Sequence, residues 1–301
     1  SFAATTLVGA VTGFGAVRAL LLIALPIMGG GMGAGATPLS KIFESTGTMS
    51  AAEAISIMSP AVAIGNAISI VIAGVIVKVL TSKTWNGQGQ LMQAGSLDPK
   101  ELEISPEMQK KRDTLSVKNL GIGLFVSNSF FAFGYICSAL WSKLVPSVTI
   151  HAYAWMIITV AICKVTGIIP EEIEIACYQW FQFIMKNLTN VLLMGIGICY
   201  LDIAQVINSF SLIYLVLCAV TCVCAFFGAA IIGKLVGFYP VEAGVTAGLC
   251  MANMGGTGDV AVLSAAERME LMPFAQISSR LGGAVILLLG SLMLSFMGGL
   301  L

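Results

Sequence analysis

Residues 29–40 read GGGMGAGATPLS and residues 252–269 read ANMGGTGDVAVLSAAERM. Each stretch places a glycine cluster inside an apolar region, one running from about residue 17 to 42 and the other from about 243 to 269. Glycine has no Cβ, so such a cluster interrupts a helix and lets another backbone approach closely. Inside a membrane an interrupted backbone is tolerated only where it is buried in protein or lines a cavity. We therefore expect two helical hairpins with glycine tips.

The glycine clusters belong to a longer repeat. GAVTGF at 9–14 aligns with GKLVGF at 233–238, and about 16 residues later a Gly-Gly-x-Gly at 30–33 aligns with one at 255–258. The other matched pairs are Val17 with Val241, Ala19 with Ala243, and Leu39-Ser40 with Leu263-Ser264. Five features in register indicate a duplicated unit. A simpler alternative, two kinked helices that pack tightly through glycine, stays open.

The composition is that of an integral membrane protein. Hydrophobic residues make up 57% of the 301 positions and charged residues 10%, against roughly 25% charged in soluble domains. The 15 basic and 15 acidic side chains cancel, which argues against nucleic-acid binding. The eight cysteines lack the CxxC spacing of a zinc site, so we interpret them as packing residues.

Apolar runs of the length that a bilayer requires, about 20 residues, predict an all-α, multi-pass chain. They cover 54–77, 119–142, 144–163, 203–233 and 281–301, and a shorter run covers 187–201. The run 203–233 is over-long, so its helix is expected to tilt or to begin after a loop near Asn208. Charged and aromatic residues alternate over 171–186, which predicts an interfacial amphipathic helix.

These elements predict a domain order. Residues 1–80 form the C-terminal part of a first repeat, with a hairpin at about 17–46 and a spanning helix at about 50–80. Residues 81–118 form a solvent-exposed linker, cytoplasmic by its lysines and arginine. Residues 119–301 form a complete second repeat, with a hairpin at about 240–270.

Counting spans from a cytoplasmic linker makes the two repeats opposite in orientation. Inverted repeats with broken helices are typical of secondary transporters, so the predicted fold has two re-entrant, glycine-tipped hairpins and an incomplete first repeat. Residue 1 aligns with about residue 225, and we expect several further helices upstream in the full protein.

Arg280, in QISSRLGG at 276–283, is the main candidate for substrate binding. An arginine near the bilayer centre costs about 2.5–3.5 kcal/mol on insertion scales, which requires a partner or an aqueous cavity. Its guanidinium can grip a carboxylate with two hydrogen bonds. The alternative is an arginine that snorkels to the interface. In the repeat alignment, Ala63 occupies the equivalent place.

Other polar residues have less specific predictions. Arg18 and Glu242 occupy equivalent places and are expected at the interface, and residues 267–270 are expected to form a solvated turn. Asp259 either caps a half-helix or helps to bind a cation. The Asn253 side-chain oxygen suits a hard cation such as Na⁺.

The three quoted motifs resemble the bacterial 2-hydroxycarboxylate transporter family, and the resemblance extends over nearly all of the chain. It implies a Na⁺- or H⁺-coupled symporter, or an exchanger, for a small organic anion such as malate or citrate. It further implies a homodimer in the bacterial inner membrane, an elevator-like movement, contact with membrane lipid, and no cofactor besides the coupling ion. The implied substrate residues are Arg280, Gly31, Met32, Gly33, Gly256, Thr257 and Gly258, and the candidate cation residues are Asn253, Cys250 and Asp259.

Two departures from citrate carriers affect the expected substrate. Those carriers have an arginine where this chain has Met254 and an asparagine where it has Met32. Loss of one cationic group favours a dicarboxylate such as malate, or a partly protonated citrate, over the citrate trianion.

One alternative class stays open, the membrane subunit of a sodium-pumping decarboxylase. That function needs a carboxylate near the membrane midplane, whereas the deepest acidic residues here, Asp202 and Asp259, are expected near helix ends. A channel is disfavoured because no continuous lined filter is evident.

Overall fold

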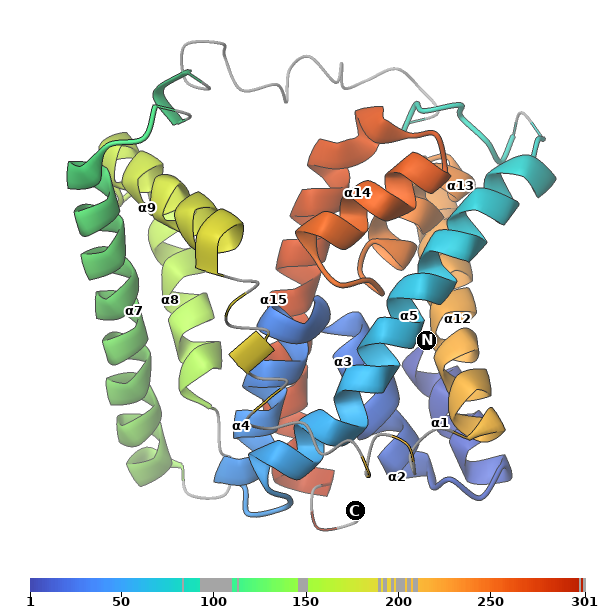
Figure 1. The fold of residues 1–301 in the computed structure, drawn as a ribbon, viewed down its shortest axis with the longest axis horizontal. Coiled ribbons are helices and arrows are strands. Elements are labelled where there is room, and N and C mark those ends of the chain that lie inside the picture. Colours follow the sequence, from blue (N-terminus) through green and yellow to red (C-terminus); the bar gives the residue numbers. More distant parts are fainter. Residues whose placement is uncertain are drawn as a thin grey trace. The chain divides into compact units, whose positions relative to one another are not determined.

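In the part of the chain that the computed structural model describes, the named elements are all helices, joined by turns and loops (Figure 1). The only β pairing in that part is one isolated antiparallel bridge, between Met92 and Phe238. The predicted all-α fold is thereby confirmed for this part. The described residues are 1–82, 84–92, 110–112, 114–145, 151–188 and 211–297, with single positions at 191, 194, 195, 198, 204, 207 and 299.

Within the described ranges, four helices are long and apolar enough to cross a membrane. They are α5 (Ala51–Val79), α7 (Val117–Leu144), α12 (Leu212–Val236) and α15 (Met272–Met297). The predicted spans 54–77 and 119–142 lie inside α5 and α7. The start of α12 at Leu212 agrees with a loop at the beginning of the over-long run, and α15 begins nine residues before the predicted 281.

Two predicted segments between these helices are only partly described. Helix α8 (Ala152–Val165) begins later than the predicted 144, and residues 146–150 lie outside the described residues. Helix α9 (Glu171–Phe183) carries three glutamates in its first turn, where the helix dipole favours negative charge. Most of the predicted short span 187–201 lies outside the described residues, which here are 187, 188, 191, 194, 195 and 198.

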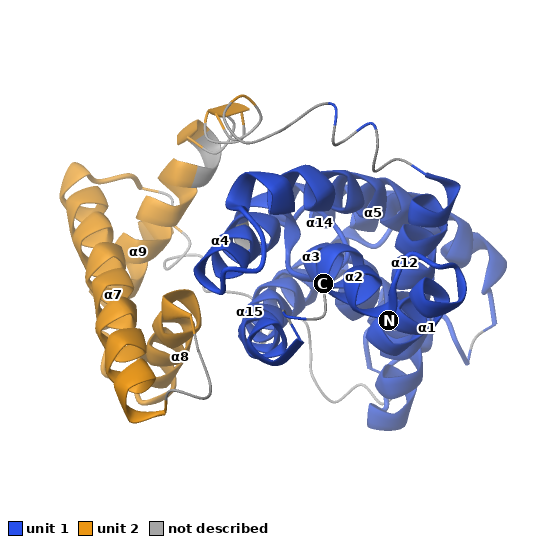
Figure 2. Cartoon of the chain, turned by 90° about the horizontal axis from the view of Figure 1, so that it is seen from below, with its two compact units in different colours: residues 1–98, 200–301 blue, residues 99–199 orange. Residues whose placement is uncertain are grey.

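The chain divides into two compact units, which Figure 2 colours separately. One unit comprises Pro99–Cys199 and contains α7, α8 and α9. Two glycines of α7 permit its close packing. A Cβ on Gly123 would lie 2.5 Å from the Ala176 carbonyl oxygen of α9, and one on Gly134 would lie 2.5 Å from the Ala152 carbonyl oxygen of α8.

The other unit comprises Ser1–Asp98 and Tyr200–Leu301 and contains the residues of both predicted hairpins. The first hairpin runs through α2 (Ala16–Ala19), a π-helical segment (Leu20–Ala24) and α3 (Leu25–Met28) to the glycine tip. It returns through a second π-helical segment (Met32–Ala36) and α4 (Thr37–Ser45). Its incoming arm is apolar on all sides and almost fully buried from residue 19 to 27, as expected of a helix inside a protein core.

The second hairpin repeats the local geometry of the first. It runs through α13 (Pro240–Ala243) and a π-helical segment (Gly244–Leu249) to its tip, and returns through α14 (Gly256–Ala265). The two incoming π-helical segments begin 224 positions apart, at Leu20 and Gly244.

Two pairs of residues outside the tips show the same equivalence. Gly9 at the end of α1 (Phe2–Val11) packs against Ala19, and Gly233 in α12 packs against Ala243, again 224 positions later. The turn glycines Gly13 and Gly237 both have positive φ, 78° and 91°.

Backbone dihedrals change the alignment at the tips by one residue. Gly31 (φ 91°, ψ −165°) precedes the outgoing arm of the first hairpin, and Gly255 (φ 86°, ψ −157°) precedes that of the second. Gly31 therefore corresponds to Gly255. The alignment of 30–33 with 255–258 expected from the sequence pairs Gly30 with Gly255 and is wrong by one residue. The pairing of Gly31 with Gly255 agrees with the Leu39-Ser40 and Leu263-Ser264 pairs, which are also 224 apart.

The beginning of the predicted exposed linker is packed. Trp85 and Leu91 accept backbone hydrogen bonds from Val241 and Tyr239 at the start of the second hairpin. Glu242 is 0% exposed, which corrects its expected interfacial position. In the expected solvated turn at 267–270, Glu267 and Glu270 are exposed as predicted, whereas the side chain of Arg268, which pairs with Glu242, is only 13% exposed.

Candidate functional site

The first tip is a run of three glycines, of which Gly30 (φ 87°) and Gly31 (φ 91°) adopt backbone conformations that L side chains rarely adopt. Only glycine takes them at low cost. At Gly29, a Cβ would lie 3.1 Å from the Gly35 Cα. The two arms of the hairpin therefore touch through glycine on both sides.

The second tip is held by side chains instead. Asn253 is 0% exposed, and its Oδ1 accepts a 2.7 Å hydrogen bond from the Gly255 amide. Its Nδ2 donates to Asp259 Oδ1 at 2.8 Å. In the tip register, Asn253 and Asp259 correspond to Gly29 and Gly35, so a hydrogen-bonded polar pair replaces a glycine contact.

The two tips contact each other. A Cβ on Gly31 would lie 2.6 Å from both the carbonyl carbon and the oxygen of Met254. One on Gly255 would lie 3.3 Å from the Gly30 carbonyl oxygen. The approach is closest at Gly31, where any side chain would overlap the backbone of the opposite tip.

Helix α5 fixes this pair of tips. A Cβ on its Gly65 would meet Ile27 of the first hairpin at 3.1 Å and the Ala252 carbonyl oxygen of the second at 3.4 Å. Asn66 Oδ1 accepts from the Met254 amide at 3.2 Å, and Ser69 Oγ donates to the Ala252 carbonyl at 3.2 Å. Sequence reasoning missed these two polar contacts.

Helix α15 touches both tips through the two glycines that follow Arg280. Gly282 faces the Met251 side chain of the second tip, and a Cβ on Gly283 would lie 3.2 Å from the Gly29 carbonyl oxygen of the first. The SSRLGG motif thus places Arg280 less than one helical turn from contacts with both hairpins. Arg280 lies about two turns into α15.

Arg280 lies at the border between the buried and the exposed face of α15. Its neighbour Ser279 is 7% exposed and donates to Asp259 Oδ2 at 3.2 Å. Arg280 itself is exposed, as are Ile277 and Leu281, and it interacts electrostatically with the Asp259 carboxylate. Asp259, 1% exposed, therefore ties the first turn of α14 to α15 beside the guanidinium.

The predicted substrate residues at the tips fall into two groups. Thr257 and Gly33 are exposed, and a Cβ on Gly33 or on Gly256 would meet no atom within 4 Å. Gly31 and Gly258, by contrast, are buried: the first faces Met254, and a Cβ on the second would lie 2.8 Å from the Asn253 side chain. Met32 is half-buried. Gly33, Gly256 and Thr257 form the open part of the site.

The outgoing arms of both hairpins begin at the tips, at Met32 and at Gly256. The first N–H groups of a helix have no intrahelical partner, and the dipole is positive at that end. Helix N-termini therefore bind anions. Two such ends, with Arg280 nearby, form an arrangement suited to a small carboxylate.

The three candidate cation residues are brought together. Asn253 and Asp259 are hydrogen-bonded, and the buried Cys250 thiol lies beside the Asp259 carboxylate. No group of three or more His, Cys, Asp or Glu side chains suited to a metal occurs among the described residues. A Na⁺ ion at this place would need carbonyl and amide oxygens as its other ligands.

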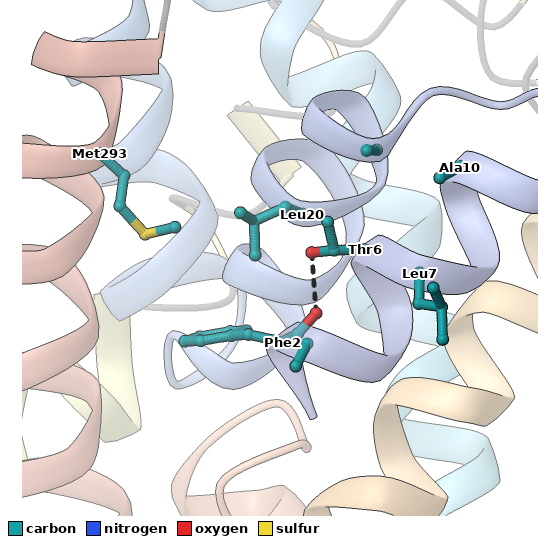
Figure 3. Close-up of a pocket in the computed structure, with 8 residues that line it drawn as sticks. Phe2, Thr6, Leu7, Ala10, Leu20 and Met293 are labelled. Carbon is teal, nitrogen blue, oxygen red and sulfur yellow. Dashed lines mark hydrogen bonds between the residues drawn. The ribbon is translucent and has the colours of Figure 1, made fainter.

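A separate apolar groove of about 510 Å³ lies among α1, α2, the start of the first π-helical segment, and α15 (Figure 3). The Thr6 hydroxyl in it is already bonded to the Phe2 carbonyl at 2.8 Å. It contains no charged side chain and no predicted substrate residue, so it is not a candidate anion site. Its lining residues are Phe2, Ala3, Thr6, Leu7, Ala10, Ala16, Leu20 and Met293.

Comparison with known proteins gives a consistent result. The chain is 38% identical over 284 residues to the citrate/sodium symporter of Salmonella typhimurium, covering 93% of this chain and 61% of that protein. It is 38% identical over 293 residues to the citrate transporter CitP of Leuconostoc mesenteroides, covering 97% and 63%. It is 37% identical over 297 residues to the malate transporter MleP of Lactococcus lactis, covering 98% and 66%.

These three relatives are named as transporters or symporters, and the chain spans about three-fifths of the length of the citrate/sodium symporter. Residues 1–292 match the 2-hydroxycarboxylate transporter family. The resemblance noted in the glycine and SSRLGG motifs is confirmed, and the chain belongs to the 2-hydroxycarboxylate transporter family.

Proposed function

We propose that the full-length protein is a secondary active transporter of 2-hydroxycarboxylates such as malate or citrate. The observation that carries the proposal is the contact between two glycine tips, with α15 touching both of them less than one turn after Arg280. The membership of the family supports it. We set aside the decarboxylase alternative, because the relatives are named as transporters.

In the proposed site, Arg280 holds one substrate carboxylate with two hydrogen bonds. The helix ends at Gly31–Gly33 and Gly256–Gly258 receive the other, and the Thr257 hydroxyl bonds an oxygen of the hydroxy acid. Met254 is 37% exposed beside these groups. Because Met254 and Met32 are apolar, the site has one fixed cationic group and suits a dicarboxylate better than a trianion.

We propose that a cation, Na⁺ or H⁺, is coupled to substrate movement by symport or exchange. Sodium has the better support, since one relative is named as a citrate/sodium symporter. Asn253 and Asp259, with the nearby backbone carbonyls and Cys250, are the residues assigned to it. A cation beside Asp259 offsets substrate charge, which explains how binding of one ion favours binding of the other.

The larger architecture is also a proposal. We infer two inverted repeats whose hairpins enter the membrane from opposite sides, in a homodimer of the bacterial inner membrane. The unit with α7, α8 and α9 is the fixed scaffold, and the unit with both hairpins carries the substrate in an elevator-like movement. The equivalent residues 224 positions apart and the division into two compact units support this assignment.

The test is uptake by the full-length protein in proteoliposomes. Labelled malate and citrate are supplied with and without an inward Na⁺ gradient, and counterflow is measured in vesicles preloaded with either acid. We expect saturable uptake of at least one acid that an imposed gradient accelerates. Neither uptake nor counterflow of any 2-hydroxy acid, by protein shown to be folded, would refute the proposed function.

A further inference from the structure

Residues 84–92, which we call the strap, follow α5 and lie against the second hairpin. The Trp85 carbonyl accepts from the Val241 amide at 2.9 Å, and the Leu91 carbonyl accepts from the Tyr239 amide at 2.9 Å. The strap ends in the antiparallel bridge between Met92 and Phe238. It is fastened along its length rather than at one point.

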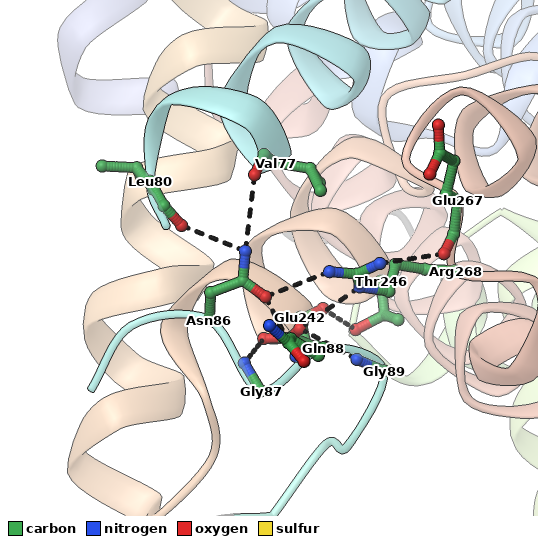
Figure 4. Close-up of polar contacts among 10 residues, drawn as sticks. All are labelled: Val77, Leu80, Asn86, Gly87, Gln88, Gly89, Glu242, Thr246, Glu267 and Arg268. Atoms are coloured by element: carbon green, nitrogen blue, oxygen red, sulfur yellow. Dashed lines mark hydrogen bonds and ion pairs between the residues drawn. The ribbon is translucent and has the colours of Figure 1, made fainter. Parts of the chain in front are cut away.

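A buried carboxylate holds the middle of the strap (Figure 4). Glu242 Oε2 accepts from the Gly87 amide at 2.9 Å, and Oε1 accepts from the Gly89 amide at 3.3 Å. Arg268 Nε lies 3.5 Å from Oε1. Both oxygens of a fully buried anion therefore face donors, which is the condition for a buried charge to be retained.

The same cluster reaches the end of α5. Asn86 Nδ2 donates to the carbonyls of Leu80 at 3.0 Å and Val77 at 3.4 Å. Asn86 Oδ1 accepts from Arg268 Nη2 at 3.1 Å. Asn86 therefore connects the C-terminal turn of α5 to the arginine that pairs with Glu242.

The positions of these residues in the fold suggest what the cluster does. Glu242 begins the second hairpin and Arg268 follows the end of α14, so the cluster joins both ends of the hairpin at its base. At its tip, the hairpin is joined to α5 by Asn66 and Ser69. Helix α5 and the second hairpin are thus fastened together at base and tip.

The first hairpin has no buried acid in the equivalent place; the acid at its base, Glu44, is exposed and pairs with Lys41. Arg18 occupies the place equivalent to Glu242, is exposed, and lies 5.9 Å from the centre of the Phe14 ring. The fastening is therefore a property of the second hairpin and not of the repeat.

We propose that Glu242 is a positioning residue: through the strap, it keeps α5 and the second hairpin together as one rigid body throughout the transport cycle. The existence of a transport cycle rests on the proposed function. The docking of the strap rests on the contacts of Glu242, Asn86 and Arg268. This role of Glu242 predicts that the strap stays bound to the second hairpin and moves with it throughout the cycle. A gate, by contrast, would have to detach and reattach.

A disulfide tests whether the strap stays docked. Paired residues of an antiparallel bridge have Cα atoms about 4.5–5.5 Å apart, within the range of a disulfide. In the full-length variant Met92→Cys/Phe238→Cys we expect near-complete disulfide formation, detected because fragments cut between the two sites stay joined. Uptake after oxidation should remain within twofold of that before, with each single variant oxidised as control.

Two results of this experiment would overturn the proposal. One is a loss of uptake greater than twofold on oxidation that a reducing agent restores, since the strap would then have to release. The other is failure of the disulfide to form in folded protein. Disulfide yield does not depend on transport. A protein that transports no 2-hydroxy acid would therefore refute the proposed function, while the disulfide yield would still test whether the strap is docked.

Glu242→Gln tests the role of the carboxylate. The amide group would turn a donor toward Arg268 or a strap amide, so we expect at least tenfold faster hydrogen exchange of 84–92 and at least tenfold slower uptake. Adding the disulfide at 92 and 238 should restore uptake to within threefold of the wild type after oxidation. Glu44→Gln, an exposed glutamate paired with Lys41, is the matched control and should leave both readouts unchanged.

The rescue separates positioning from a direct role in ion coupling. If Glu242 itself carried an ion, the disulfide would not replace it, and uptake would stay low after oxidation. That result, or unchanged exchange in Glu242→Gln, would overturn the assignment. If Glu242→Gln does not fold, Arg268→Lys keeps a charge but not the guanidinium fork, and it should give a smaller change in the same direction.

Discussion

The contact between the glycine tips makes Gly31→Ala the sharpest perturbation of the site. Gly31 has φ 91° and ψ −165°, a region nearly exclusive to glycine, and forcing alanine into it costs about 1–3 kcal/mol. The new Cβ would also lie 2.6 Å from the Met254 carbonyl, where ordinary contact begins at 3.4 Å, so the tips must separate by about 0.8 Å. Overpacking of this kind costs about 1–3 kcal/mol more.

The combined cost of about 2 kcal/mol or more corresponds to at least thirtyfold in an equilibrium constant. We expect this free-energy cost to appear as weaker malate binding, as a lower melting temperature, or as both. Calorimetry and thermal denaturation of the purified full-length protein measure the two quantities. Gly33→Ala is the matched control, because its Cβ meets no atom within 4 Å and its φ is not positive. The control should not lower the melting temperature. Wild-type stability together with wild-type affinity in Gly31→Ala would refute the packing of the two tips.

Three further predictions concern single side chains. Arg280→Lys should raise the malate KM of uptake about tenfold or more, because a charge-assisted hydrogen bond of about 1.5–3 kcal/mol is lost; an unchanged KM would remove Arg280 from the site. Met254→Arg should raise citrate affinity relative to malate at least tenfold in competition uptake, and an unchanged ratio would reject Met254 as the basis of selectivity. Asn253→Ala should raise the Na⁺ concentration for half-maximal uptake several-fold, whereas an unaltered Na⁺ dependence would exclude Asn253 from the cation site.

Much of the fold could be predicted from the sequence, because the determining signals are local. Long apolar runs predict α5 and α7, and the Ser50–Glu53 capping pair explains why α5 begins at Ala51: Ser50 Oγ accepts from the Glu53 amide at 3.2 Å. The glycine clusters predict the chain breaks because the positive φ angles at Gly30 and Gly31 depend on the local sequence.

The Gly-Gly-x-Gly pattern predicts the wrong register at the tips, although the flanking matched pairs are all 224 positions apart. Gly-Gly-x-Gly occurs in both copies, but the backbone equivalence is set by which glycine takes the positive φ before the outgoing arm. In the first copy only residues 30–33 match Gly-Gly-x-Gly, which pairs Gly30 with Gly255, whereas the dihedral angles identify Gly31 as the partner of Gly255.

The packed strap could not be predicted because its hydrogen bonds join residues far apart in the chain. A glutamate beside an apolar helix is usually solvated, and nothing in the composition of 84–92 indicates that the Gly87 and Gly89 amides meet Glu242. Hydrogen bonds between residues so far apart in the chain leave no periodic pattern in the sequence. The same reason explains why Asn66 and Ser69 were not singled out beside Arg280.

The central claim is that both tips and Arg280 hold one substrate together, and a cryo-EM structure of the full-length protein with malate tests it most directly. We predict malate density with one carboxylate within hydrogen-bonding distance of the Arg280 guanidinium and the other at the backbone of 31–33 and 256–258. Ordered malate bound elsewhere, with these tips and Arg280 free of it, would contradict the account.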